Sequence, residues 1–341
     1  MTNLDERKGA ILRAIVEQYV ASAQPVGSRT VAQASGLGVS AATIRNEMSA
    51  LERDGLIHQP HTSAGRVPTD LGYRYYVDNL AGAGRLTPEL RREVADFFTS
   101  ASRAIDDLLH DTSLLLARIT HHAALIVGPQ PEVVRISDAH LSRLQPDVAL
   151  VVVILSNGAV EKQLVSVDAD ASDEDLASAG VRLAQLLDDR TLADLPVLPP
   201  EGSARPDVAD RVARSAYDAL RTDGERHAGE PLYVGGVSRL AAEHEAFGDS
   251  SHATRVLELL EQHTVIAALL RELLGPGLTV RIGSENEQAD LRECSIVLAP
   301  YLVEGEAVGT VGVLGPTRMD YRQATAAVTA VSQRLGRRLS T

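Results

Sequence analysis

Apolar positions at the start of the chain recur with a helical period that is interrupted at glycine and serine. Residues 4–21 are predicted to form an amphipathic helix with its apolar positions on one face. A second helix is predicted to begin at Ser28, whose hydroxyl can cap it, and to end at Gly36, which has no Cβ to oppose a left-handed turn. After this turn, Ser40 is predicted to cap a third helix.

The third predicted helix has one apolar stripe and one small, polar face. Ile44, Met48 and Leu51 recur at i, i+4 and i+7, so they are expected to be buried together. The opposite face carries Ala41, Ala42, Arg45, Asn46 and Ser49. Small residues let a helix enter the major groove of DNA, where Arg pairs with guanine edges and Asn with adenine edges. This pattern therefore predicts a DNA-recognition helix.

A two-stranded ribbon is predicted to follow, with strands at residues 56–59 and 66–67 and a turn at 60–65. Together with the helices before it, this ribbon predicts a winged helix-turn-helix domain over residues 1–80. Arg66 would contact a phosphate or enter the minor groove. The predicted DNA-binding residues are Ser28, Arg29, Ser40, Ala41, Ala42, Thr43, Arg45, Asn46, Ser49, His61, Thr62, Ser63 and Arg66. Thr69 would then cap a helix over residues 70–80, whose three tyrosines are expected to pack beneath the ribbon.

Strand-rich segments on both sides of a helical middle predict a split α/β domain. Residues 81–120 are expected to be a linker and a long helix, whose heptad-like seam would pack on a domain core or on a partner subunit. The core is predicted to comprise residues 121–190 and 273–341. Residues 191–272 are predicted to form an inserted, mainly helical domain that buries its apolar helices against a second copy.

Charge counts against strong non-specific binding to nucleic acid. The chain has 33 basic and 46 acidic residues, a net charge of −13, whereas residues 1–80 hold eight of each. A neutral DNA-binding domain attracts phosphates weakly. Affinity is therefore expected to depend on a few arginines, a helix N-terminus and the avidity of two linked half-sites.

The residue content predicts a cytoplasmic protein without enzyme activity. One cysteine excludes an intrachain disulfide, and the longest apolar run has eight residues, whereas a membrane span needs about 20. The start of the chain is polar, so no signal peptide is expected. His58 and His61 lack the cysteine or acidic cluster of a zinc site, and Cys294 has no nearby histidine. We therefore predict no catalytic residue, no metal and no cofactor.

Six stretches of the chain resemble the family of heat-inducible transcription repressors called HrcA. They are PVGSRTV at 25–31, VSAATIRNEM at 39–48, HTSAGRVPTDLGYRYYVD at 61–78, YVGG at 233–236, RIGSEN at 281–286 and GTVGVLGPTRMDY at 309–321. The resemblance covers both ends of the chain, and the stretches TSAGRVP at 62–68 and GPTRMDY at 315–321 are specific.

This resemblance implies a homodimeric repressor that binds an inverted-repeat DNA operator, CIRCE, ahead of chaperone operons. It also implies that the GroEL chaperonin keeps the repressor active until heat draws the chaperonin away. The implied fold is α+β and multidomain: a winged helix-turn-helix, a GAF-like core and a dimerisation domain inserted into that core. Two other functions stay open, namely a metabolite-sensing regulator that uses the GAF-like core as its ligand domain, and an enzyme with a DNA-binding appendage.

Overall fold

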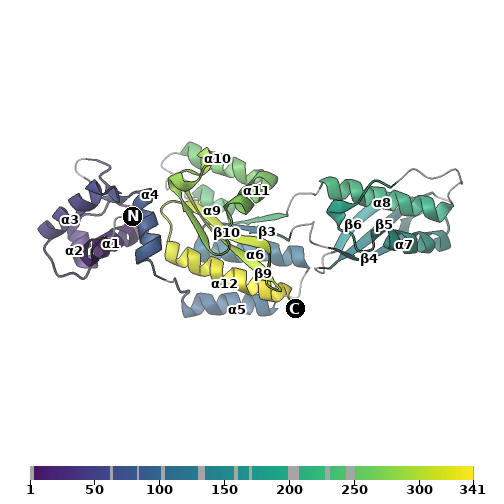
Figure 1. The fold of residues 1–341 in the computed structure, drawn as a ribbon, viewed down its shortest axis with the longest axis horizontal. Helices are drawn as coiled ribbons and strands as arrows, with labels where there is room; N and C mark the ends of the chain where they lie inside the picture. Colours follow the sequence, from purple (N-terminus) through teal and green to yellow (C-terminus); the bar gives the residue numbers. More distant parts are fainter. Residues whose placement is uncertain are drawn as a thin grey trace. The chain divides into compact units, whose positions relative to one another are not determined.

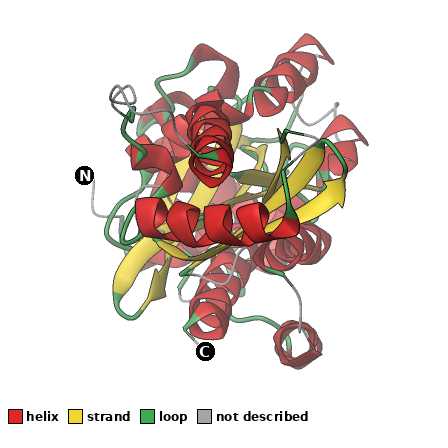
Figure 2. Ribbon diagram, turned by 90° about the vertical axis from the view of Figure 1, so that its right-hand side faces the viewer, coloured by secondary structure: helices red, strands yellow, loops and turns green. Residues whose placement is uncertain are grey.

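The computed structural model describes residues 4–61, 64–82, 84–100, 104–129, 135–156, 160–168, 171–198, 207–226, 231–242 and 250–340. These residues form a mixed α+β chain (Figures 1 and 2). One unit comprises residues 1–100, 112–126 and 234–340, and a second comprises residues 101–111 and 127–233. Each unit has its own sheet and its own core.

The helices are α1 Glu6–Ser22, α2 Ser28–Ala34, α3 Ala41–Arg53, α4 Asp70–Tyr75, α5 Pro88–Ser100, α6 Ile105–Thr120, α7 Asp173–Leu187, α8 Val208–Arg226, α9 Val237–Ala242, α10 Ser250–Glu261, α11 His263–Leu273 and α12 Tyr321–Leu339. The strands are β1 Ile57–His58, β2 Val67–Pro68, β3 Ala123–Val127, β4 Ile136–Gln145, β5 Val148–Leu155, β6 Val160–Ser166, β7 Leu232–Gly235, β8 Thr279–Ile282, β9 Cys294–Val303 and β10 Glu306–Pro316. A π-helical turn, η1, covers Tyr76–Leu80, and short 3₁₀ turns are η2 Leu192–Asp194, η4 Gly283–Glu285 and η5 Ala289–Leu291.

The first three helices and the β1–β2 ribbon, with α4 and η1, make up what we call the head (residues 4–80). The predicted stripe of α3 is confirmed, because Ile44, Met48 and Leu51 are all buried. Ser40 caps this helix as predicted. The prediction that Ser28 caps α2 is wrong. Gly27 is the N-cap and Ser28 is already helical, with no side-chain cap bond.

A backbone bridge explains the displaced cap. Val26 and Arg66 exchange two backbone N–H···O bonds of 2.9 Å, so the chain is extended up to Gly27 and turns helical directly after it. Gly65 permits this approach, since a Cβ there would lie 2.5 Å from the backbone of Val26. The bridge thus ties the ribbon to the start of α2.

Of the tyrosines of α4 and η1, Tyr73 and Tyr76 are buried and Tyr75 is half-buried, and their neighbours are not confined to the ribbon. Tyr73 is 2% exposed, and its ring centroid lies 5.6 Å from that of Tyr321 on α12. Tyr76 donates to Glu17 of α1 at 3.4 Å. The prediction of a packing role is confirmed for Tyr73 and Tyr76, and an aromatic neighbour of Tyr73 comes from the far end of the chain.

The predicted long connecting helix is two helices. The last turns of α5 carry Thr99 and Ser100, whose hydroxyls donate to backbone carbonyls of the preceding turn. Such bonds compete with helix propagation. Seam residues Val94 and Phe98 are buried, and α5 packs on α12, so the alternative of packing on the chain's own core is confirmed for α5.

The first unit contains a five-stranded sheet in the order β7-β3-β10-β9-β8. Strands β8, β9 and β10 pair antiparallel with their chain neighbours, and Glu304 and Gly305 connect β9 to β10 as predicted. Helix α12 packs on β9 and β10. Helices α9, α10 and α11 also belong to this unit.

The second unit contains a separate three-stranded antiparallel sheet in the order β4-β5-β6, and α7 and α8 cover one of its faces (Figure 1). Strand β5 alternates between buried and half-buried residues, and its buried positions meet the helices. The division predicted from the sequence differs from this one. Strands β4, β5 and β6 pair with one another and are not part of the five-stranded sheet. The second unit therefore covers residues 101–111 and 127–233 and contains a sheet, whereas the predicted insertion covers 191–272.

Candidate nucleic-acid interface

Helix α3 presents the polar face that the sequence predicts. Arg45, Asn46 and Ser49 are exposed, as is Ala42 near the start of the helix. Ser40 accepts a bond from the Thr43 backbone N–H at 3.2 Å, and its hydroxyl lies 3.1 Å from the Thr43 hydroxyl. Ala41 and Thr43 are half-buried. The first turn of α3 is thus capped, small and open on one side.

The carboxylates of α3 are bound by cations from elsewhere in the head. Glu47 lies 3.7 Å from Arg7, Glu52 2.9 Å from Arg66, and Asp54, the C-cap residue, 3.7 Å from Lys8. In contrast, neither Arg29 nor Arg45 has a hydrogen bond or ion pair within the described part of the chain, and both are exposed. A head of zero net charge therefore has uncompensated positive charge on α2 and α3.

Arg66, which the sequence predicts to contact a phosphate or enter the minor groove, is bound within the head. Its guanidinium is paired with Glu52, and its side chain is only 18% exposed. Because its backbone also bridges Val26, Arg66 connects the ribbon to both α2 and α3. In this structure it orients the ribbon relative to α3.

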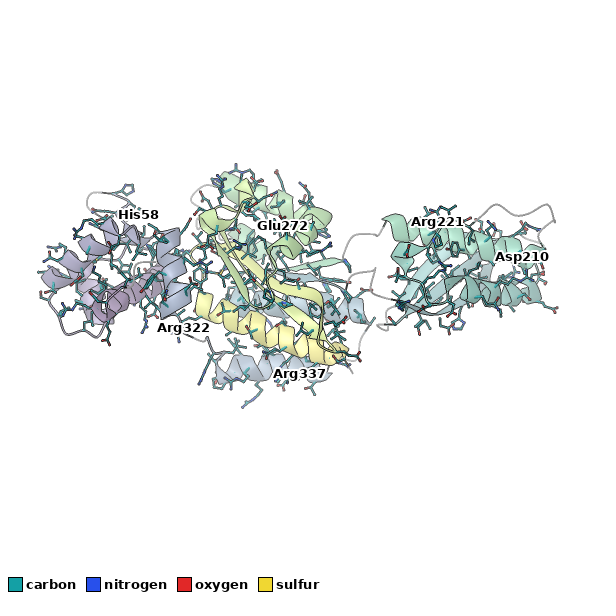
Figure 3. All side chains as sticks on the ribbon, viewed as in Figure 1. His58, Asp210, Arg221, Glu272, Arg322 and Arg337 are labelled. Carbon is teal, nitrogen blue, oxygen red and sulfur yellow. The ribbon has the colours of Figure 1, made fainter. Side chains whose placement is uncertain are left out.

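The remaining predicted contacts lie in the ribbon and at the start of α2. His61 is exposed, and so is His58 on β1 (Figure 3). Ser28 is half-buried in the first turn of α2. Thr62 and Ser63 fall outside the residues that the structure describes. Of the predicted set, the structure thus brings residues of α2, α3 and the ribbon into one head.

Sequence reasoning missed one basic residue of the α3 face. Arg53 is exposed and its Nε donates to the Ser49 carbonyl at 3.4 Å. The signal was present, because Arg45, Ser49 and Arg53 recur at i, i+4 and i+8. This exposed face therefore continues to the end of the helix.

The sequence also missed the contact that supports the head on the five-stranded sheet. Arg74 of α4 donates to both carboxylate oxygens of Glu285, at 2.7 and 2.5 Å, and to the carbonyl of Val280 at 2.6 Å. Hydrogen bonding to Glu285 raises the pKa of Arg74 further above its ordinary range, against the opposing effect of burial. No local pattern links these residues, since 211 positions separate Arg74 from Glu285.

Among the described residues, no group of three or more His, Cys, Asp or Glu side chains could hold a metal ion. None of the helices described combines the length and the apolar composition that a bilayer crossing requires.

Comparisons with known proteins point to one family, and they cover nearly the whole chain. A family model described as the HrcA protein C terminal domain matches residues 106–325. A protein named heat-inducible transcription repressor HrcA from Nocardioides sp. is 40% identical, with 98% of each chain covered. Its namesake from Streptomyces avermitilis is 38% identical, with 99% of each covered.

A crystal structure of a hypothetical protein shares the fold, with a TM-score of 0.70, 24% identity and coverage of 99% of this chain and 98% of that one. The family model spans more than half of this chain, and the two named repressors match it nearly end to end. The chain belongs to the HrcA family of heat-inducible transcription repressors.

Proposed function

We propose that the chain is a dimeric repressor whose head is a winged helix-turn-helix that reads an operator with α3. The observation that carries this proposal is the state of Arg45. It is exposed and unpaired among the described residues, while the carboxylates of the same helix are bound by Arg7, Lys8 and Arg66. Arg45 and Asn46 would contact base edges, and Arg29 and the first turn of α3 would contact phosphates.

Dimerisation is supported by an uncovered apolar surface of the second unit. We call it the open sheet face, and it comprises Leu144, Val148, Leu150, Val152, Ile154, Val160 and Leu164. Leu150 pairs with Leu164 and Ile154 with Val160, while Lys162 lies between them opposite Val152, so the apolar positions are continuous along β5 and flanked by Leu164 and Val160. Leu164 is 57% exposed. Contiguous apolar patches of this kind mark interaction sites, and we propose that a second copy covers this one.

The resemblance to the family supplies the finer proposal. The operator would be the inverted repeat CIRCE ahead of chaperone operons, a GroEL-type chaperonin would keep the repressor active in the cytoplasm, and the five-stranded sheet with α12 would be the GAF-like core. Residues 127–233 would take the dimerising role that the sequence predicts for residues 191–272. Chaperonin dependence is tested by adding purified GroEL to the repressor and operator. Unchanged operator occupancy would refute it.

The experiment that tests the main proposal is a gel shift with the full inverted repeat and with one half-site, at matched salt. We expect strong preference for the full repeat, because a head without net charge gains little from non-specific phosphate attraction. Equal binding to both fragments that disappears together as salt rises would contradict sequence-specific recognition by two heads.

A further inference from the structure

A hollow of about 660 Å³ lies within the first unit, and we call it the arginine hollow. It is lined by residues of α4 and η1, by residues 81, 82 and 84–86 that follow the head, and by residues of α5, of β8 and the position before it, and of α12. Volumes of this order are typical of small-molecule sites. Neither the recognition helix nor the open sheet face contributes to it.

The lining is strongly basic. Its charged side chains are Arg74, Arg85, Arg91, Arg334 and Arg337, with Asp78 as the carboxylate. Figure 3 labels Arg337 in the C-terminal part of α12. Asp78 is already paired with Arg74 at 3.1 Å. Five guanidinium groups and one carboxylate thus line the hollow, in a chain whose overall charge is −13.

Part of this positive charge has no counterpart in the protein. Neither Arg85 nor Arg334 has a hydrogen bond or an ion pair among the residues that the structure describes. Within the described residues, Arg91 donates to the Leu86 carbonyl, at 3.5 Å. Arg74 of the same lining is instead paired, with Glu285 and with Asp78. The hollow therefore presents unused guanidinium donors to whatever enters it.

Apart from Gln333 and Tyr321, the rest of the lining is small or apolar. Ala326, Thr329 and Ala330 of α12 leave room, and Leu278, just before β8, is 46% exposed. Such a wall can accommodate a ring or a short apolar group beside the charged part of a ligand.

We propose that the arginine hollow binds a small polyanion that carries two or more phosphate groups. Guanidinium forks match phosphate oxygens in pairs, and several forks around one cavity call for several phosphates rather than one carboxylate. Both an inorganic polyphosphate and a nucleoside polyphosphate have this chemistry. The latter would place its nucleoside against the apolar wall.

Such a ligand would contact the head and the core of the first unit together. Arg74 and Val77 belong to the head, Arg85 to the segment that follows it, and Arg334 to α12. A ligand that binds this arrangement of the head and α12 more tightly than other arrangements increases the fraction of molecules that adopt it. If that arrangement differs in operator affinity, the ligand changes operator binding by the same coupling free energy.

The test is isothermal titration of the full chain with inorganic tripolyphosphate, ATP and adenosine. We expect saturable binding of the two phosphorylated probes, weakening as salt rises, and none of adenosine. Arg334→Glu and the milder Arg85→Gln should each weaken binding about tenfold or more. Arg13→Glu is the matched control, because Arg13 is exposed on α1, unpaired among the described residues and outside the hollow.

Equal affinity for tripolyphosphate and ATP would assign the site to the phosphate chain, and tighter binding of ATP would assign it to a nucleoside polyphosphate. The proposal is overturned if neither probe saturates below about 1 mM. It is also overturned if Arg13→Glu weakens binding as much as Arg334→Glu does. If the hollow variants instead reduce operator binding and no polyphosphate binds, the arginines contact the DNA backbone. Arg45→Ala separates the two proposals, because it should lose operator binding and keep the polyphosphate.

Discussion

Arg74 and Glu285 are 211 positions apart in the chain and form a two-pronged ion pair, with Nε–Oε1 at 2.7 Å and Nη2–Oε2 at 2.5 Å. Beside it, Asp70 accepts a bond from the Ser284 backbone N–H at 2.9 Å. A Cβ at Gly283, where φ is +52°, would lie 2.4 Å from the Asp70 carboxyl group. The start of α4 and the turn η4 therefore fit together closely, and this contact attaches the head to the sheet of its own unit.

Removing one partner of this pair should cost stability. Arg74→Ala leaves Glu285 partly buried without its cationic partner, so we expect a loss of about 1.5–3 kcal/mol in the free energy of unfolding. Urea denaturation measures it. The matched control is Arg7→Ala, which breaks the more exposed 3.7 Å pair with Glu47 and should change stability by less than about 0.5 kcal/mol. Equal losses in the two variants would show that the Arg74 pair is energetically ordinary.

The same pair should make stability depend on acid pH. Burial raises the pKa of Glu285, but hydrogen bonds from Arg74 and from the Ile282 backbone N–H outweigh it, so the pKa is lower than the ordinary 4.5. A carboxylate with a lowered folded-state pKa contributes stability that is fully present above pH 4.5 and is lost as the pH falls through the lowered value. Acid unfolding of Glu285→Gln should therefore show a shallower pH dependence below about pH 4.5 than the native chain. Identical acid limbs in both proteins would contradict this linkage.

The α3 face should determine operator affinity without affecting the fold. Arg45→Ala and Asn46→Ala each remove an exposed side chain, so the melting temperature should not change. Operator binding should weaken by about 1–3 kcal/mol for each variant, the usual worth of a base contact. Fluorescence anisotropy with the full inverted repeat provides the measurement, and Arg13→Ala on α1 is the control. Full operator affinity in both variants would remove α3 as the recognition helix.

A charge on the open sheet face should produce monomers. Leu164→Lys places an ammonium group in the patch that we propose is covered by a second copy, and burying an unpaired charge is costly. Val181 on α7 is 61% exposed and lies on the helical side of the same unit, so Val181→Lys should leave the dimer intact. Sedimentation velocity distinguishes the two. A dimer that survives Leu164→Lys unchanged would assign dimerisation to another surface.

Cys294 should be inert in the folded protein. The residue is fully buried at the start of β9, and burial, followed by Glu293 and Asp290, raises the pKa of its thiol to about 12. Reaction requires the thiolate, so a thiol reagent at neutral pH should label the native chain far more slowly than the urea-unfolded chain. Comparable labelling rates in the two states would contradict this burial.

Some features of this protein follow from the sequence alone because they depend on residues a few positions apart. The stripe of Ile44, Met48 and Leu51 specifies which side of α3 is buried, and with it which side carries Arg45 and Asn46. Ser40 and Thr69 cap their helices with their own hydroxyls. The period of a helix and the chemistry of a cap are local, so no knowledge of the rest of the fold was needed to predict them.

Other features were decided only by the tertiary structure. Alternation in β5 indicates a half-buried strand, but it does not say whether β3 or β4 lies beside it, so the boundary of the inserted unit could not be predicted. The tertiary structure also decided the partner of Arg66, because the sequence does not say whether its guanidinium pairs with a carboxylate such as Glu52 or with a phosphate. The head contacts Glu285 and Tyr321, which follow the second unit in the sequence. The arginine hollow likewise combines residues of the head with residues of α12. Sequence periodicity specifies which side of an element is buried, whereas long-range packing alone decides what covers it.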